Sequence, residues 1–209
     1  MIYSFPSTND PIRQGDIFVG IPRIDFSLDK IAILVDDHFE ETSWDELATK
    51  DRPITALMGA KPVTAIVISQ DCDSLRVPDI TLCEIRNFRR VELKSKETQK
   101  PNKWVKILTQ HARINQKWFY LPPDDKVGFK DKMGVDFLVT IRVSRADLER
   151  LRPLRKCCLN EIARDHFRER ISEFFRRYSY DEWYSLNKEE LEAYKRDYPD
   201  AEPFLWQDF

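Results

Sequence analysis

The sequence predicts an α+β protein in which a small, strongly curved antiparallel sheet or barrel precedes a group of helices. Three observations support this prediction. Short runs of β-branched and aromatic residues, separated by turn residues, fill most of the chain up to residue 141. Residues 63–68 form a continuous apolar run, which is typical of a strand buried on both faces. Helical periodicity becomes dominant only after residue 144.

The strands are expected to follow the order of these runs. Gly15 and Asp16 are expected to form a turn before the first strand, and Pro22 is expected to end that strand. Residues 94–103 contain no apolar side chain and are expected to form an exposed loop. The strands are predicted at 17–19, 31–35, 63–69, 80–85 with an extension to Val91 left open, 104–108, 117–121 and 135–141.

Helix signals appear in an insertion and in the last third of the chain. Ser43 followed by Glu46 is a capping-box pattern, which predicts one short helix within an insertion at 36–60. A similar start stands at Ser144, an amphipathic pattern covers 159–178, and a final helix is expected at 188–198. These signals predict a barrel domain at 1–151, which includes the insertion, and a helical extension at 152–209 packed on the barrel.

Composition excludes several classes of protein. The 209 residues are 42% hydrophobic and 33% charged, enough to bury a core, which excludes a wholly disordered chain. No apolar run approaches the roughly 18 residues of a membrane helix, and the N-terminus lacks the basic start of a signal peptide. We therefore expect a cytoplasmic protein without a membrane partner. The four cysteines form no Cys-x-x-Cys pair and the three histidines are scattered, so no structural zinc site is predicted. No residue is assigned as a metal ligand, and no cofactor is predicted.

The net charge is −2, but the charged residues are unevenly distributed along the chain. Residues 84–132 and 142–177 are basic, whereas residues 1–60 and the chain after 181 are acidic. This asymmetry permits an anionic partner such as RNA or DNA, but the opposite segments can equally face one another or be solvated. The aromatic run 118–120 can stack bases or pack in the core. The predicted nucleic-acid-binding residues are Lys61, Arg86, Arg89, Arg90, Arg113 and Lys117.

The strand at 63–69 ends in a polar cluster, residues 69–74, where a loop is expected to present side chains. Asp71, Cys72 and Asp73 are the candidate catalytic residues. Cys72 is a candidate nucleophile, but the flanking carboxylates disfavour its thiolate, and a small buried thiol is the simpler interpretation. The two aspartates, with Glu84, can hold Mg²⁺, or they can fix the turn by hydrogen-bonding their own backbone.

Two further patterns carry alternative chemistry. Pro78-Asp79 followed by Glu92-Leu93-Lys94 matches the PD…ExK nuclease signature, in which the acids hold a metal and the lysine assists the attacking water. The acidic run 36–41 includes a histidine and can ligate a metal or form an exposed loop. The arginines of the helix at 159–178 can contact phosphates, but pairing with acids of the same helix is favoured by their spacing. Those acids are Glu161, Asp165, Glu169 and Glu173.

The order of these elements resembles the SH3-like barrel of the MazF/PemK toxin superfamily over residues 13–151. The similarity rests on Gly15-Asp16-Ile17 before the first strand and on the Pro-led strand from Lys61 to Ser69. It also rests on a strand carrying Asp136 that runs through Ile141-Arg142 into Ser144-Arg145. The resemblance implies a barrel fold and action on RNA. Two departures concern cleavage, since the family's catalytic Arg corresponds to Lys61 and its Thr is missing from residues 84–87.

Three functions therefore remain open on the sequence alone. The first is action on nucleic acid, as a toxin-like or defence-related ribonuclease or as an inactive relative of one. The second is a non-catalytic protein-interaction module, with a protein partner or a homodimer. The third is a Mg²⁺-dependent nuclease of the PD-(D/E)xK type. The sequence leaves open whether the protein is an enzyme.

Overall fold

The computed structural model describes residues 2–50, 53–87, 117–176, 188–197 and 199. The chain divides into two compact units, Met1–Phe175 and Arg176–Phe209. In the second unit the structure describes helix α7, Lys188–Asp197, close to the predicted bounds. The first unit contains the sheets and all the other described helices. The predicted loop at 94–103 and the predicted strand at 104–108 lie outside the described residues.

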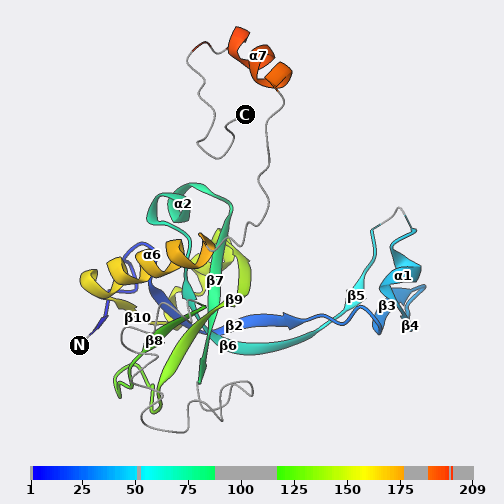
Figure 1. Ribbon diagram of the computed structural model, residues 1–209. Coiled ribbons are helices and arrows are strands. Elements are labelled where there is room, and N and C mark those ends of the chain that lie inside the picture. Colours follow the sequence, from blue (N-terminus) through cyan, green and yellow to red (C-terminus); the bar gives the residue numbers. More distant parts are fainter. Residues whose placement is uncertain (1, 51–52, 88–116, 177–187, 198, 200–209) are drawn as a thin grey trace, which may run out of the picture. The chain divides into compact units, whose positions relative to one another are not determined.

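The protein is α+β, as the sequence predicts, and its main sheet is a strongly curled antiparallel half-barrel (Figure 1). This sheet has seven strands in the order β1-β10-β2-β6-β7-β9-β8, so the strands nearest the two ends of the unit pair with each other. The strands are β1 (Tyr3–Ser4), β2 (Asp16–Asp25), β6 (Gly59–Val67), β7 (Asp79–Asn87), β8 (Trp118–Leu121), β9 (Met133–Ser144) and β10 (Arg155–Leu159).

The C-terminal end of the central strand β6 is buried on both faces, as the apolar run in the sequence predicts. Ala65, Ile66 and Val67 are all fully buried. Ile66 belongs to one hydrophobic core, whereas Ala65 and Val67 belong to a second. Because successive side chains of a strand point to opposite faces, the two cores lie on opposite sides of the sheet.

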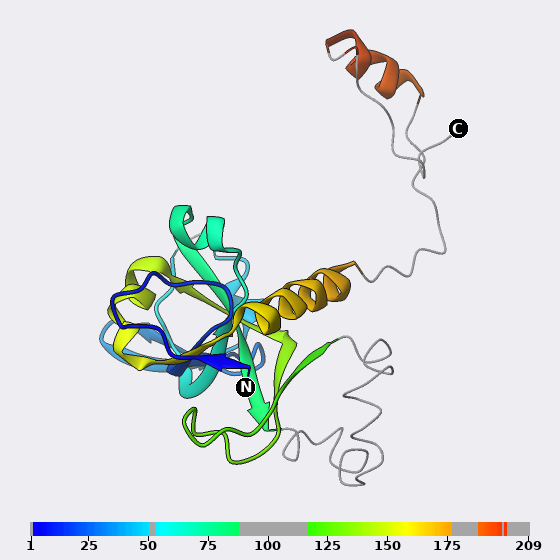
Figure 2. The same cartoon turned by 90° about the vertical axis from the view of Figure 1, so that its left-hand side faces the viewer.

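One core is covered by helix α6, Glu161–Phe175, which lies along the sheet in both views (Figures 1 and 2). Its buried side chains, Ala163, Phe167 and Phe174, lie on one helical face. The ring of Phe167 packs edge-on against Phe119 of β8, with 4.9 Å between the ring centroids. The expected helix at 159–178 is therefore confirmed, although it begins after β10.

The opposite core is covered by helix α5, Arg145–Arg150, through the buried side chain of Leu148. The predicted cap is present, because the Ser144 hydroxyl accepts a hydrogen bond from the Asp147 amide. A 3-10 turn, η3 (Arg152–Leu154), then leads directly into β10. Strand β10 was not expected from the sequence, which placed the last strand at 135–141.

Pro22 does not end the first strand, because β2 continues to Asp25. In the pairing of β2 with β6, Pro22 faces Pro62. At this point β2 has passed its last partner in β10, and β6 has not yet reached its first partner in β7. Each proline therefore lies on a strand with one neighbour, where a missing amide donor is tolerated.

Between Asp25 and Gly59, which pair at the end of this ladder, the chain forms a second, small sheet. Its strands are β3 (Ile31–Val35), β4 (His38–Thr42) and β5 (Ala56–Leu57), in the order β4-β3-β5, with helix α1 (Trp44–Leu47). The strand at 31–35 thus belongs to the insertion and not to the main sheet. The capping box differs too, since Ser43 makes no side-chain cap and Thr42 donates to Glu46 instead.

The β3–β4 hairpin turns through two aspartates with left-handed backbone conformation. The φ angle is 43° at Asp36 and 64° at Asp37. Two-residue hairpins favour positive φ at both positions, and Asn-Gly is the preferred pair, because a β-carbon disfavours this region. The turn therefore retains strain that a glycine would remove.

We expect Asp37→Gly to stabilise the hairpin by about 1 kcal/mol, through relief of the left-handed strain. Amide hydrogen exchange of β3 and β4 should slow by about fivefold. Asp37→Ala removes the same carboxylate but keeps a β-carbon, so it should speed the exchange. Equal effects of the two substitutions would contradict a conformational cause.

A buried ion pair joins the neighbouring strands β10 and β2. The Arg155 guanidinium donates to the Asp16 carboxylate at 2.8 Å, and each side chain is only 2% exposed. The same guanidinium donates to backbone carbonyls of Ser7 and Asp10 at 2.5 and 2.9 Å. Burial raises the pKa of Asp16 above its ordinary value, and the hydrogen bond from Arg155 opposes the rise. This one arginine thus ties the N-terminal segment to the last strand.

Arg155→Met should lower the free energy of unfolding by about 3–5 kcal/mol, because it leaves a buried carboxylate unpaired. The pKa of Asp16 in the folded state then rises further, so protonation favours the folded variant. The loss should therefore be smaller at pH 4 than at pH 7 in denaturant unfolding. In Arg155→Met/Asp16→Asn the pH dependence of the loss should disappear. A loss that is independent of pH in the single variant would contradict the assignment.

Candidate functional site

The polar cluster after β6 forms a corner and a short helix instead of the predicted loop. The backbone amides of Ile68 and Ser69 both donate to the Thr81 carbonyl of β7, at 3.0 and 3.3 Å. The Ser69 hydroxyl accepts from the Thr81 amide at 2.9 Å. Helix α2, Asp71–Arg76, starts directly after this anchored corner. The three candidate catalytic residues therefore occupy the first turn of a helix.

Asp71 lies in a closed network with Gln14 and Arg168. Its carboxylate accepts hydrogen bonds from the backbone amide of Gln14 at 2.8 Å and from the Arg168 guanidinium at 2.6 Å. Arg168 also donates to the side-chain oxygen of Gln14 at 2.9 Å. The side-chain nitrogen of Gln14 in turn donates to the backbone carbonyl of Ile68 at 2.7 Å. The network joins the turn before β2, the corner after β6 and helix α6.

The network lines an open pocket of about 440 Å³, which we call the Arg168 pocket. Gln14 is almost fully buried at its base, whereas the Arg168 side chain is 40% exposed. The polar lining includes amide, hydroxyl, thiol, carboxylate and guanidinium groups next to apolar carbon, which suits a ligand with hydrogen-bonding and charged groups. The lining residues are Gln14, Ile68, Gln70, Asp71, Cys72, Arg168, Ile171 and Ser172.

Cys72 opens onto this pocket as an exposed free thiol. Its sulfur lies 3.8 Å from the Gln70 side-chain oxygen and 3.8 Å from an Asp73 carboxylate oxygen. These neighbours are hydrogen-bond acceptors and supply no positive charge that would favour a thiolate. Cys72 is thus placed to touch a ligand in the pocket, while the expectation of a buried thiol does not describe it.

Of the predicted nucleic-acid-binding residues, the structure describes Lys61, Arg86 and Lys117, and each lies beside a carboxylate or an aromatic ring. Lys61 pairs with Asp25 at 3.3 Å, and Arg86 contacts Asp136 at 3.2 Å. The Lys117 ammonium lies 5.6 Å from the centre of the Trp118 ring. Arg89, Arg90 and Arg113 lie outside the described residues.

Two further arginines, Arg13 and Arg164, lie close in the chain to residues that line the pocket. Arg164 precedes Arg168 by one turn of α6, and Arg13 precedes Gln14 in the chain. Burial raises the pKa of the Cys158 thiol, and the charges of Arg164, Arg155 and Arg13 oppose the rise, so these groups lie close to that thiol. Arg168 also pairs with Asp165, as the helical spacing predicts. Its contact with Asp71, 97 residues earlier in the chain, was not predictable from spacing.

The candidate metal ligands are committed to other partners. Both oxygens of Asp71 are used in the network, and Glu84 is paired with Arg23 at 2.5 Å. Asp79 of the PD…ExK pattern pairs with Arg142 at 2.5 Å, and Glu92 and Lys94 lie outside the described residues. Over the described ranges, no three His, Cys, Asp or Glu side chains are grouped to hold a metal ion.

Comparison with known proteins gives no match to a family model, a curated protein or a solved structure. None of the described helices is long and apolar enough to cross a membrane.

Cys72 should be the thiol that a disulfide reagent labels first in the native protein at pH 8, because it is exposed. Burial raises the pKa of Cys83 and of Cys157 to about 12, so both stay protonated and shielded. One fast equivalent per chain is expected, and Cys72→Ser should remove it. A fast equivalent that persists in this variant would contradict the described exposure.

Proposed function

We propose that the protein acts on nucleic acid and that a backbone phosphate binds in the Arg168 pocket. The observation that carries the proposal is the half-exposed guanidinium of Arg168, held in an open pocket by Gln14 and Asp71. A guanidinium that already makes charge-assisted hydrogen bonds to a carboxylate presents the fork geometry that also binds phosphate.

The neighbouring charges support this choice of ligand. Across the described residues, neither Arg13 nor Arg164 forms an ion pair with a carboxylate, and each lies within four residues of a pocket residue in the chain. Gln70 and Ser172 add neutral hydrogen-bonding groups to its wall. The resemblance of the sequence to MazF/PemK toxins favours RNA as the nucleic acid.

In this proposal Asp71 has two roles. In the free protein it neutralises Arg168, with 2.6 Å between the two groups. An incoming phosphate competes for the guanidinium, and the released carboxylate can then accept the proton of a ribose 2′-hydroxyl as that oxygen attacks phosphorus and the 5′-oxygen departs. The site is therefore suited to a ribonuclease, and an inactive relative would keep the binding role alone.

The pocket does not lie where the toxin family places its arginine. Lys61, at the corresponding position, is near the start of β6, and the Arg168 pocket follows the end of that strand. Val67 lies six positions after Lys61 in the strand, which is about 20 Å at the rise of a β-strand. Variants at Lys61 and at Arg168 therefore test different sites.

Binding of a fluorescent single-stranded RNA should weaken steeply with salt, and Arg168→Met should reduce the affinity by about tenfold and the salt slope by about one. Arg142→Met is the matched control, because Arg142 also pairs with an aspartate but lies on β9. No binding at low salt, or equal losses in the two variants, would overturn the proposal.

The catalytic role is tested by incubating RNA with and without Mg²⁺. Asp71→Asn keeps the shape of the side chain but removes its charge, so cleavage should fall by about 10²-fold or more while binding persists. Unchanged cleavage would exclude Asp71 from the chemistry. Loss of cleavage in Lys61→Met alone would place the reaction at the family position. Cleavage that requires Mg²⁺ and is lost in Asp79→Asn would favour the PD-(D/E)xK alternative.

A further inference from the structure

The small sheet has one face that its own core does not use. In the pairing of β3 with β4, Leu34 faces Phe39 and Ala32 faces Glu41, while Ala32 also faces Leu57 of β5. Directly opposed residues of paired strands point to the same side. These five residues, Ala32, Leu34, Phe39, Glu41 and Leu57, therefore share one face, which we call the outer face.

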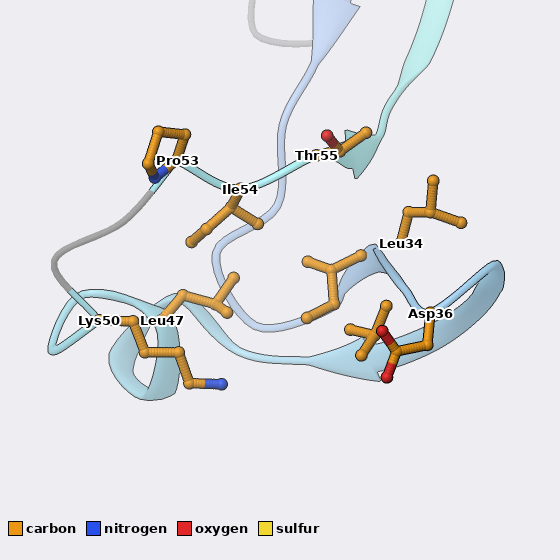
Figure 3. Close-up of a pocket in the computed structure, with 9 residues that line it drawn as sticks. Leu34, Asp36, Leu47, Lys50, Pro53, Ile54 and Thr55 are labelled. Atoms are coloured by element: carbon orange, nitrogen blue, oxygen red, sulfur yellow. The ribbon is translucent and has the colours of Figure 1, made fainter.

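The other side of this sheet holds its hydrophobic core. Ile31, Ile33 and Leu47 are buried there, with Ile54 packed against them. Figure 3 shows Leu47 and Ile54 pointing toward each other while Leu34 points away from both. A pocket of about 240 Å³ opens beside this core and is lined largely by polar atoms. The core thus accounts for one face only.

The outer face exposes large apolar side chains. Leu34 is 41% exposed, Phe39 61% and Leu57 62%. Of the thirteen large apolar residues that are exposed in the described chain, eight lie between residues 24 and 58. A concentration of this kind differs from scattered apolar residues, which need no explanation, and is typical of an interaction surface.

The charge around the outer face selects the kind of partner. Residues 26–58 contain eight acidic and three basic residues. Glu41 lies on the face itself, and the Asp36-Asp37 turn stands at the end of the hairpin. A second copy docked face to face would bring two acidic rims together, which costs free energy. An anionic membrane would be repelled for the same reason.

We propose that the outer face is a docking surface for a protein partner that presents apolar side chains flanked by lysine or arginine. Apolar residues of the partner cover Leu34, Phe39 and Leu57, and its basic residues meet the acidic rim. The proposal is independent of the Arg168 pocket, because it uses none of the pocket residues.

The test measures binding of the full-length protein to a synthetic peptide of alternating lysine and valine. Phe39→Ser/Leu57→Ser should weaken this binding by tenfold or more. Leu138→Ser is the matched control, because Leu138 on β9 has the same 62% exposure as Leu57. It should leave the affinity unchanged. Peptides in which glutamate replaces lysine, or serine replaces valine, should bind at least tenfold more weakly.

A charge-reversed variant keeps the test decisive if the double serine variant unfolds. Glu41→Lys reverses the charge of an exposed side chain on the outer face and should shift the preference from the lysine peptide toward the glutamate peptide. The proposal is overturned if the lysine–valine peptide does not bind, or if Leu138→Ser weakens binding as much as the double variant. It is also overturned if the wild type forms a dimer that Phe39→Ser/Leu57→Ser dissociates, or if vesicles of neutral or anionic lipid bind through this face.

Discussion

Burial of the C-terminal end of β6 on both faces is the constraint on which the rest of this structure depends. Ala65, Ile66 and Val67 cannot be exposed on either side, so the curled sheet needs two separate covers. Helix α6 covers one core, and helix α5 covers the other. Because α6 follows β10 directly, covering the first core also brings the arginines of α6 beside the corner at which β6 ends. The Arg168 pocket is a consequence of this packing.

The two proposed surfaces differ in how they are built. The Arg168 pocket is assembled from three segments far apart in the chain, and its polar groups hold one another in place through charge-assisted hydrogen bonds. The outer face is local, since a single hairpin and a two-residue strand create it. The first surface suits recognition of a small anionic group, and the second suits a broad contact with another chain.

Several strands and helix starts could be predicted from local pattern. The strand at 31–35, the central strand and the Ser144 cap follow from side-chain type and spacing. Strand β10 could not be predicted, because Arg155 and Lys156 interrupt its apolar pattern and its pairing partners β1 and β2 are distant in sequence. The prediction that Pro22 ends the first strand was wrong for a related reason, since the effect of a proline depends on whether its strand has one neighbour or two.

The sequence by itself determined that Asp71, Cys72 and Asp73 end a buried strand, and that the arginines of α6 lie at helical spacing among acids. Only the tertiary structure decided that Arg168 pairs with Asp71 and Gln14, and that Lys61 and Arg86 are occupied by carboxylates. The physical reason is the distance along the sequence over which each kind of interaction acts. Strand and helix patterns report which side of a segment is buried, whereas an ion pair depends on which segments the two cores bring together.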